Sequence, residues 1–380
     1  MYIKRYLHEP ILELLKKKQK KNRVIVLYGP RQVGKTTLIK ELIKGCGLKT
    51  KFFACDDPDI KSLLSGIGLS KLKTLVAGYD LVVFDEAQRI REIGTMLKLL
   101  IDYLPKKKVL VSGSSSLDLA NKISEALTGR KKTFFMYPLS LGEVYLKKDE
   151  MDIKTGVDRI MRFGTYPVAF SLSDEMEVED YLLELARDYL YKDALEYQQV
   201  KNTEQIRKLL VALALQIGQE VSYTELANTV GVDQKTVVRF IDLLEKSFVI
   251  FRLSAFSRNL RNELNKTRKI YFYDLGIRNA LIKNFNNFEL RNDKGNVWEN
   301  FLIVERMKRD AVKKERKNYY FWRTYDKKEI DLIEERGGKL NGFEFKWNSR
   351  SFKKPKLFLE KYKSSSLSLV NRENFLDFVM

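Results

Sequence analysis

The sequence predicts an α/β protein whose N-terminal region is a P-loop domain with a doubly wound parallel sheet. Three observations predict this class. Apolar segments alternate with helical patterns through residue 140, as in parallel sheets whose strands are connected by helices. Residues 29–36 read GPRQVGKT, which matches a phosphate-binding loop. The chain has 380 residues, more than one ordinary core accommodates, so we expect two or three domains.

The first region should contain one leading helix and five strands. Residues 1–22 have the apolar spacing of an amphipathic helix. The strands are near-continuous apolar runs, which are typical of parallel strands buried on both faces. They are expected at residues 23–29, 50–57, 81–86, 108–116 and 131–140. A helix should follow the P-loop from residue 36, and helical patterns fill the other gaps.

The rest of the chain changes pattern twice. Residues 141–200 are mostly helical, with a break at the GTYP segment 164–167. Residues 203–255 read as three helices and a strand, and from about residue 259 the chain is mixed and basic. Further strand signals lie at 269–274, 318–324, 329–335 and 341–347.

A helix-turn-helix pattern with a following wing strand covers residues 220–253. Thr224–Val230 is the first expected helix, Gly231 makes the turn, and Asp233 caps the second helix. The second helix should expose the side chains of Gln234, Lys235, Thr236 and Arg239. Only two of these four are basic, so the module either contacts DNA or docks against protein.

Composition limits the classes of function. The formal net charge is +20, and residues 251–380 hold 30 basic and 17 acidic residues, a net charge of +13. A basic domain favours a polyanionic partner such as nucleic acid, and the alternative is a solvated, lysine-rich surface. The longest apolar stretch, 210–217, is too short to cross a bilayer, so we expect no membrane span.

Cysteine and histidine are too scarce for several chemistries. Cys46 and Cys55 fit a reducing compartment rather than a disulfide framework, and the N-terminus does not resemble a signal peptide, so we expect a cytoplasmic protein. His8 is the only histidine, which excludes histidine-paired nucleophiles and histidine-rich metal sites. Any chemistry must therefore use carboxylates, Lys, Arg and a metal held by oxygen ligands.

The P-loop motif follows an expected strand and opens an expected helix, which is the context that nucleotide binding requires. Its glycines let backbone N–H groups face the phosphates, Lys35 should reach the β- and γ-phosphates, and Thr36 should ligate Mg²⁺. ATP and Mg²⁺ are the expected cofactors. The residues expected to contact the nucleotide are Gly29, Pro30, Arg31, Gln32, Val33, Gly34, Lys35, Thr36 and Thr37.

Two acids end the third expected strand. Asp85 should complete the Mg²⁺ shell, and Glu86 should orient and polarise the attacking water. Ser112 and Ser114 end the fourth strand, where they either sense the γ-phosphate or form a turn. Arg130 is the candidate arginine finger or phosphate sensor, acting within the chain or across an oligomer, unless it is an ordinary surface residue.

A second group of charged residues lies near the C-terminus. Asp331 falls on one expected strand, and Glu344 and Lys346 alternate on the next, so these two face the same side. Glu299 lies upstream in a helical segment. Such a set can hold Mg²⁺ or Mn²⁺ for a nuclease reaction, and the alternative is a cross-strand Glu–Lys pair on a solvated sheet.

Several motifs occur in an order that resembles a known family. GPRQVGKTT, LVVFDEAQR, VSGSSS, LTGR, YPLSLGE and GTYP are followed by RLSAFSRNL, KIYFYDLGIRNAL, GNVWENFLIVE, FWRTYDKKEIDLI and FEFKW. Together they resemble the prokaryotic AAA-like ATPases that carry a C-terminal domain of unknown function. The resemblance covers nearly the whole chain.

This resemblance implies four regions. They are an ASCE-type P-loop ATPase core (1–140), a helical lid (141–200), a winged helix (201–256) and an α/β, restriction-endonuclease-like domain similar to PD-(D/E)XK nucleases (257–380). By the same resemblance, Asp331, Glu344 and Lys346 match the nuclease core, and Glu299 matches its upstream helical acid. Trp347 departs from the family pattern, where a small polar residue is expected, and a large indole there would narrow the site.

Two functions follow from these expectations. The first is an ATP-dependent enzyme that moves or clamps nucleic acid and cleaves it with the C-terminal domain. The second is an ATP-driven switch whose C-terminal domain only binds a partner. Metal-dependent cleavage that Asp331→Ala abolishes would exclude the second function.

Overall fold

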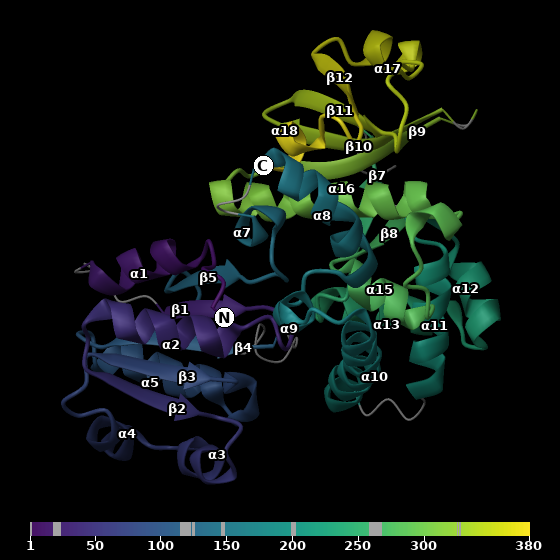
Figure 1. The fold of residues 1–380 in the computed structure, drawn as a ribbon. Helices are drawn as coiled ribbons and strands as arrows, with labels where there is room; N and C mark the ends of the chain where they lie inside the picture. Colours follow the sequence, from purple (N-terminus) through teal and green to yellow (C-terminus); the bar gives the residue numbers. More distant parts are fainter. Residues whose placement is uncertain are drawn as a thin grey trace. The chain divides into compact units, whose positions relative to one another are not determined.

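The computed structural model describes residues 2–17, 24–114, 123, 126–145, 149–198, 203–257, 268–324, 326 and 328–380, with the backbone alone for 188–198 and 203. The chain divides into two compact units, labelled by element in Figure 1. The first comprises Met1–Pro138, Leu195–Gln199 and Lys246–Phe248. The second comprises Leu139–Ala194, Val200–Glu245 and Val249–Met380.

The first unit contains a five-stranded sheet in which every neighbouring pair is parallel. The strand order is β2-β3-β4-β1-β5. The bounds are β1 Val24–Tyr28, β2 Thr50–Ala54, β3 Leu81–Asp85, β4 Lys108–Gly113 and β5 Lys131–Phe135. The predicted parallel sheet is therefore confirmed, and β4 lies between the P-loop strand and the strand that ends in Asp85.

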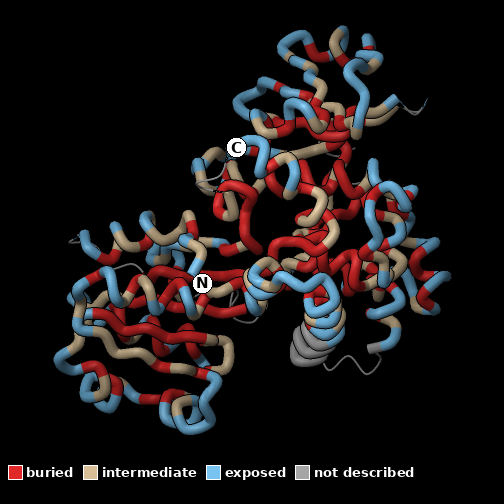
Figure 2. Tube along the Cα trace, viewed as in Figure 1, coloured by how far each residue is buried: buried red, intermediate tan, exposed pale blue. Residues whose placement is uncertain are grey.

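Burial follows the sequence pattern in this sheet. Every residue of β1 and β3 is buried, as their continuous apolar runs predict. Edge strand β5 is half-buried or exposed along its length. Figure 2 shows these buried strands in red inside paler connecting segments. The core includes the stacked rings of Phe53 and Phe84, whose centroids lie 5.4 Å apart.

The helices of this unit connect and precede the strands. They are α1 His8–Lys16, α2 Lys35–Cys46, α3 Pro58–Leu64, α4 Leu69–Leu75, α5 Ile93–Tyr103 and the short η1 Ala87–Arg89. The expected helix over 1–22 is wrong at its start, because α1 begins only at His8. Pro10 explains this, since proline is tolerated in the first turn of a helix but breaks its interior. Residues 18–22 lie outside the described residues.

The second unit contains a seven-stranded mixed sheet of order β12-β11-β10-β9-β7-β8-β6. The bounds are β6 Glu220–Val221, β7 Ile250–Ala255, β8 Arg268–Phe272, β9 Asn318–Arg323, β10 Glu329–Arg336, β11 Lys339–Phe345 and β12 Ser365–Val370. Strand β7, expected as the wing, pairs antiparallel with β8 and parallel with β9. One sheet therefore joins strands from the regions expected as winged helix and C-terminal domain.

The helices after residue 140 precede, separate and follow these strands along the chain. They are α7 Leu141–Val144, α8 Glu150–Phe163, α9 Pro167–Ser171, α10 Glu175–Gln198, α11 Thr203–Leu215, α12 Tyr223–Val230, α13 Gln234–Lys246, α15 Leu275–Leu281, η2 Phe288–Leu290, α16 Lys294–Lys313, α17 Lys356–Lys361 and α18 Phe375–Val379. No helix among the described residues is long and apolar enough to cross a membrane.

The helix-turn-helix elements occur where the sequence predicts them. Gly231 follows α12 in the left-handed conformation, with φ of 76°, which glycine adopts without strain. Asp233 accepts a hydrogen bond from the Thr236 backbone N–H at 2.9 Å and a second from its hydroxyl at 2.8 Å. Asp233 therefore caps α13 as expected, whereas the assignment of the module as a DNA-contacting winged helix stays a prediction.

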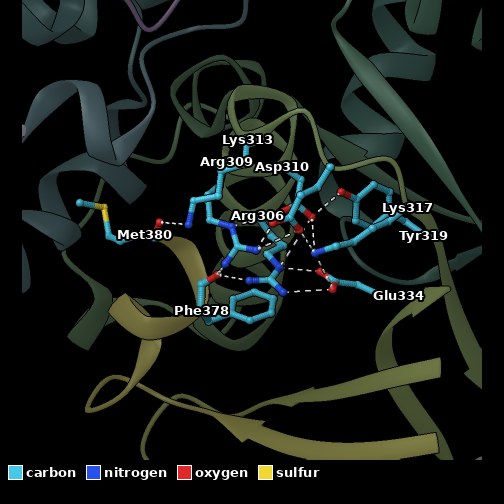
Figure 3. Close-up of polar contacts among 10 residues, drawn as sticks. Arg306, Arg309, Asp310, Lys313, Lys317, Tyr319, Glu334, Phe378 and Met380 are labelled. Carbon is cyan, nitrogen blue, oxygen red and sulfur yellow. Dashed lines mark hydrogen bonds and ion pairs between the residues drawn. The ribbon is translucent and has the colours of Figure 1, made fainter. Parts of the chain in front are cut away.

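A buried network of charges joins α16 to the sheet and to α18 (Figure 3). Arg306 on α16 donates through Nε and Nη2 to the two carboxylate oxygens of Glu334 on β10, at 2.5 and 3.0 Å. Lys317 reaches both Glu334 and Asp310, at 3.1 and 3.0 Å. Arg306 also donates to the carbonyl of Phe378 on α18 at 2.7 Å. These contacts hold three elements together with side chains that are almost fully buried.

Candidate functional site

The P-loop lies at the carboxyl edge of the first sheet, directly after β1. Gly29 leaves no room for a side chain, because an added Cβ would lie 2.2 Å from the Met136 carbonyl oxygen. Gly34 turns the chain into α2 with φ of 92°, which favours glycine. These two glycines let the backbone curl as phosphate binding requires. Gln32 and Thr37 have exposed side chains, and Pro30 and Val33 are buried.

The Lys35 side chain lies inside the loop rather than in solvent. Only 4% of the residue is exposed, and its ammonium donates to the carbonyl oxygens of Gly29 and Pro30 at 2.9 and 2.8 Å. It lies 3.9 Å from a carboxylate oxygen of Glu86. The ammonium therefore lies between the loop backbone and Glu86, the acid that follows β3, where phosphate charge is expected.

Asp85 connects the P-loop helix with the adjacent strands. The Thr36 hydroxyl donates to one oxygen of the Asp85 carboxylate at 2.6 Å, and the Ser112 hydroxyl donates to the other. Asp85 is 5% exposed. A hydroxyl and a carboxylate in direct contact are hard oxygen ligands of the kind that Mg²⁺ takes beside nucleotide phosphates, so Thr36 and Asp85 fit the expected ion. Ser112 orients this acid in the structure.

Glu86 lies at a strained position beside them. It has φ of 53° and ψ of 42°, the left-handed region that non-glycine residues rarely adopt. The Gln88 amide donates to the Glu86 carboxylate at 2.5 Å and to the Ser114 hydroxyl at 3.0 Å. The Glu86 backbone N–H donates to the Ser112 hydroxyl at 3.4 Å. Gln88 was missed by the sequence reasoning, although an amide two residues after the acid was a usable signal.

Arg5 is a further residue of this site. It is 6% exposed and donates to the carbonyl oxygens of Val33 in the P-loop and of Tyr137 after β5, at 2.8 and 2.6 Å. The structure shows that Arg5 ties the back of the P-loop to the segment that follows β5.

Arg130 does not join the P-loop within the chain. It precedes β5, and its carbonyl accepts the backbone hydrogen bond of Val24 at the start of β1. The loop follows the other end of β1, about 13 Å further along the strand. The Arg130 guanidinium forms an ion pair with Asp102. A phosphate-sensing role within one chain is therefore wrong, and a role across an oligomer stays a prediction.

The C-terminal acids lie close together in the second unit. Burial raises the pKa of Asp331 well above its usual range, and the neighbouring Glu299 and Glu344 carboxylates raise it further. The Asp331 carboxylate accepts a hydrogen bond from the Phe345 backbone N–H at 2.7 Å. Lys346 pairs with Glu344 at 2.7 Å. The structure therefore brings together the four residues that the sequence singled out.

Three further residues complete this cluster. Lys269 on β8 lies 3.0 Å from a carboxylate oxygen of Glu299 and also pairs with Glu329. The Tyr271 hydroxyl donates to the same Glu299 oxygen at 2.5 Å. Sequence reasoning missed Lys269, Tyr271 and Glu329. The signal was present, because Lys269 and Tyr271 alternate on one face of an expected strand.

These residues do not fit a divalent metal. Within the part of the chain that the structure describes, no three His, Cys, Asp or Glu side chains converge as metal ligands. The Lys269 ammonium lies between two of the carboxylates, and one oxygen of Asp331 accepts a backbone hydrogen bond. The expected metal set of Glu299, Asp331 and Glu344 is therefore not supported by the arrangement of its side chains.

Trp347 does not narrow the acidic cluster. Its ring packs against Trp298 and Phe288, at centroid distances of 5.7 and 5.3 Å. The Arg372 guanidinium lies over the indole at 4.7 Å. The narrowing expected from the sequence is therefore wrong, because the indole packs in its own aromatic cluster.

Three family models match separate parts of the chain. Residues 21–145 match a model described as an AAA domain, residues 154–287 a domain of unknown function (DUF8612), and residues 294–377 another domain of unknown function (DUF4143). The first match covers the parallel sheet, the P-loop and the acids of β3. The N-terminal part of the chain is thus similar to AAA domains over the parallel sheet and the P-loop.

Similar proteins extend over most of the chain. An uncharacterized protein of Mycobacterium tuberculosis is 29% identical over 331 residues, which cover 86% of this chain and 70% of the relative. An uncharacterized protein of Methanocaldococcus jannaschii is 27% identical over 307 residues, 69% of this chain and 63% of the relative. The structure of a Walker-type ATPase of Pyrococcus abyssi aligns over 74% of this chain and 96% of that protein's chain, with 16% identity and a TM-score of 0.48.

Proposed function

We propose that the chain binds ATP with Mg²⁺ at the P-loop and hydrolyses it. One observation carries this proposal. The Thr36–Asp85 hydrogen bond of 2.6 Å brings the P-loop helix and the acidic strand together, with Lys35 and Glu86 beside it. This arrangement unites phosphate-binding, metal-binding and water-orienting groups at one edge of the sheet.

Each residue then has a distinct part in the reaction. Thr36 and Asp85 would hold Mg²⁺, which would supply neutralising charge to the phosphates when bound. Lys35 exchanges its two loop carbonyls for phosphate oxygens and stabilises the charge that develops on them. Glu86 accepts a proton from water as the water oxygen bonds to the γ-phosphorus and the bond to ADP breaks. Gln88, which also donates to the Ser114 hydroxyl, holds the carboxylate of Glu86 before it meets that water.

ATP turnover by three proteins tests the proposal. Glu86→Gln removes the proton acceptor but keeps the shape, so ATP should still bind while turnover falls by about 10²-fold or more. Lys35→Ala should remove binding. Glu92→Gln is the matched control, because Glu92 also has a positive φ of 58° but precedes α5 outside the site. Wild-type turnover in Glu86→Gln would show that the assignment is wrong.

A nucleic-acid partner is the second part of the proposal. The net charge of +13 after residue 250 supports it, together with the exposed Lys235 and Arg239 on α13. Replacing both residues with Ala should lower DNA affinity at every sequence and reduce the slope of log K against log salt by about 2. An unchanged slope would exclude α13 as the contact.

A continuous backbone path supports a switch driven by this ATPase. The Met136 N–H donates to the carbonyl of Tyr28, the residue before the P-loop, at 2.7 Å. Three residues later, in the second unit, the Leu139 carbonyl accepts from Lys308 on α16 at 3.0 Å. All three tryptophans lie in the second unit, so ATP should change their fluorescence in the wild type but not in Lys35→Ala. Identical spectra with and without ATP would contradict the switch.

A further inference from the structure

Lys269, a residue of the chain itself, places a positive charge within the C-terminal acidic cluster. Lys269 is 3% exposed, although lysine is almost never buried without partners. Its ammonium contacts Glu299 at 3.0 Å and pairs with Glu329, and it lies 5.5 Å from the centre of the Phe321 ring. These contacts satisfy a positive charge that burial would otherwise penalise strongly.

The carboxylates depend on this ammonium in return. Glu299 sits on α16, Glu329 begins β10, and Lys269 lies on β8, which is separated from β10 by β7 and β9 in the sheet order. One buried side chain thus links a helix and two non-adjacent strands. The positive charge of Lys269 attracts the carboxylate oxygens of Glu299 and Glu329. A divalent ion among the same oxygens would be repelled by the ammonium beside it.

Lys346 has a different position. Its side chain is 43% exposed, and the ion pair that it forms within the described part of the chain is with Glu344, two residues earlier on β11. Lys269 therefore differs from Lys346, the lysine of the predicted nuclease pattern, because it is buried and pairs with two carboxylates. Lys346 is a matched control for Lys269.

We propose that the Lys269 ammonium takes the place of the divalent metal in this cluster. The cluster is then a metal-independent tie between α16, β8 and β10, and the C-terminal part of the chain acts by binding rather than by metal-dependent cleavage. This inference goes beyond the proposed ATPase function and does not depend on it, because it concerns side chains of the second unit alone.

Binding of Mn²⁺ to the nucleotide-free full chain tests the proposal. Every protein carries Asp85→Asn, so that the carboxylate of the ATP site does not contribute. Calorimetric titration of this parent should show no Mn²⁺ bound at the cluster. Lys269→Met keeps the length of the side chain and removes the charge, so it should bind Mn²⁺ at least about tenfold more tightly than the weakest binding that the titration of the parent can detect. Adding Glu299→Gln should abolish the gain, and Lys346→Met should resemble the parent.

The parent protein alone can overturn the inference, whether or not Lys269→Met folds. If the parent binds one Mn²⁺ per chain and Glu299→Gln or Asp331→Asn removes that binding, a metal shares the cluster with Lys269 and the proposal is wrong. Plasmid nicking by wild-type protein with Mn²⁺, lost on Asp331→Asn, would overturn it as well. Neither measurement involves ATP turnover, so failure here is distinct from failure of the ATPase assignment.

Discussion

Glu334 is the residue through which the buried charge network of the second unit can be tested. Glu334 is 1% exposed and accepts hydrogen bonds from both Nε and Nη2 of Arg306. Glu334→Gln keeps the size of the side chain but removes its charge. Among the described residues, the Arg306 and Lys317 cations then share only Asp310 as a buried anion (Figure 3).

The expected loss of stability in Glu334→Gln follows from the burial of these cations. Removing one partner of a buried ion pair typically destabilises a protein by about 3–5 kcal/mol, because the other charge stays buried and unpaired. Asp310 is 1% exposed and keeps its contacts to Lys317 at 3.0 Å and to the Tyr319 hydroxyl at 2.8 Å. Since Asp310 still neutralises part of the charge, we expect Glu334→Gln to lower the free energy of unfolding by about 3 kcal/mol, the lower end of that range.

Urea unfolding followed by tryptophan fluorescence measures this loss. Trp298, Trp322 and Trp347 all lie in the second unit, so the signal reports the unit that contains the network. Glu373→Gln is the matched control, because Glu373 pairs with Arg350 in solvent, where the two side chains are 61% and 81% exposed. The control should not change the midpoint measurably. Equal midpoints for Glu334→Gln and the wild type would refute the reasoning.

Three other changes test separate features. Thr36→Val removes the hydroxyl that contacts Asp85, so ATP affinity should become insensitive to Mg²⁺, and retained Mg²⁺ dependence in an ATP-binding titration would contradict this. Burial alone would raise the pKa of Asp293, but hydrogen bonds from Arg291 and the charge of Arg278 lower it to about 2. A depressed carboxyl pKa stabilises the fold above the unfolded pKa, so Asp293→Asn should lose about 2 kcal/mol at pH 7. That difference should shrink as the pH of unfolding assays falls from about 4 towards 2, and a constant difference would contradict the pairing. The pKa of Asp331 is raised, mainly by burial, so ionisation of this carboxyl opposes folding. The melting temperature of Asp331→Asn should therefore rise relative to that of the wild type as the pH rises above about 4. The absence of this trend would contradict the raised pKa.

The first unit was predictable because its signals are local. Continuous apolar runs gave β1 and β3, and the motif GPRQVGKT placed the loop between a strand and a helix. The contact between Thr36 and Asp85 follows from the order of these strands and motifs along the chain, because the carboxyl ends of parallel strands meet at one edge of the sheet. Arg130 was misplaced because its nearness to β5 in sequence did not say which end of the sheet it occupies.

The second unit was harder to predict because its pairings are distant in the chain. The strand signals at 269–274 and 329–335 were recognised, yet nothing local shows that Lys269 reaches Glu329, sixty residues further on. The pairing of β7 with β9 is equally remote, so the shared sheet could not be read from the pattern of residues 203–255. Trp347 illustrates the same limit, because its neighbours Phe288 and Trp298 come from other elements.

ATP hydrolysis by Glu86→Gln tests the central claim most directly. Release of phosphate from γ-labelled ATP should be measured with excess enzyme, so that binding and turnover are separated, and the bound nucleotide should be quantified in the same samples. The account predicts that Glu86→Gln retains bound ATP with Mg²⁺ while phosphate release falls by about 10²-fold or more relative to wild type and Glu92→Gln. Equal rates of phosphate release in Glu86→Gln and the wild type would contradict it.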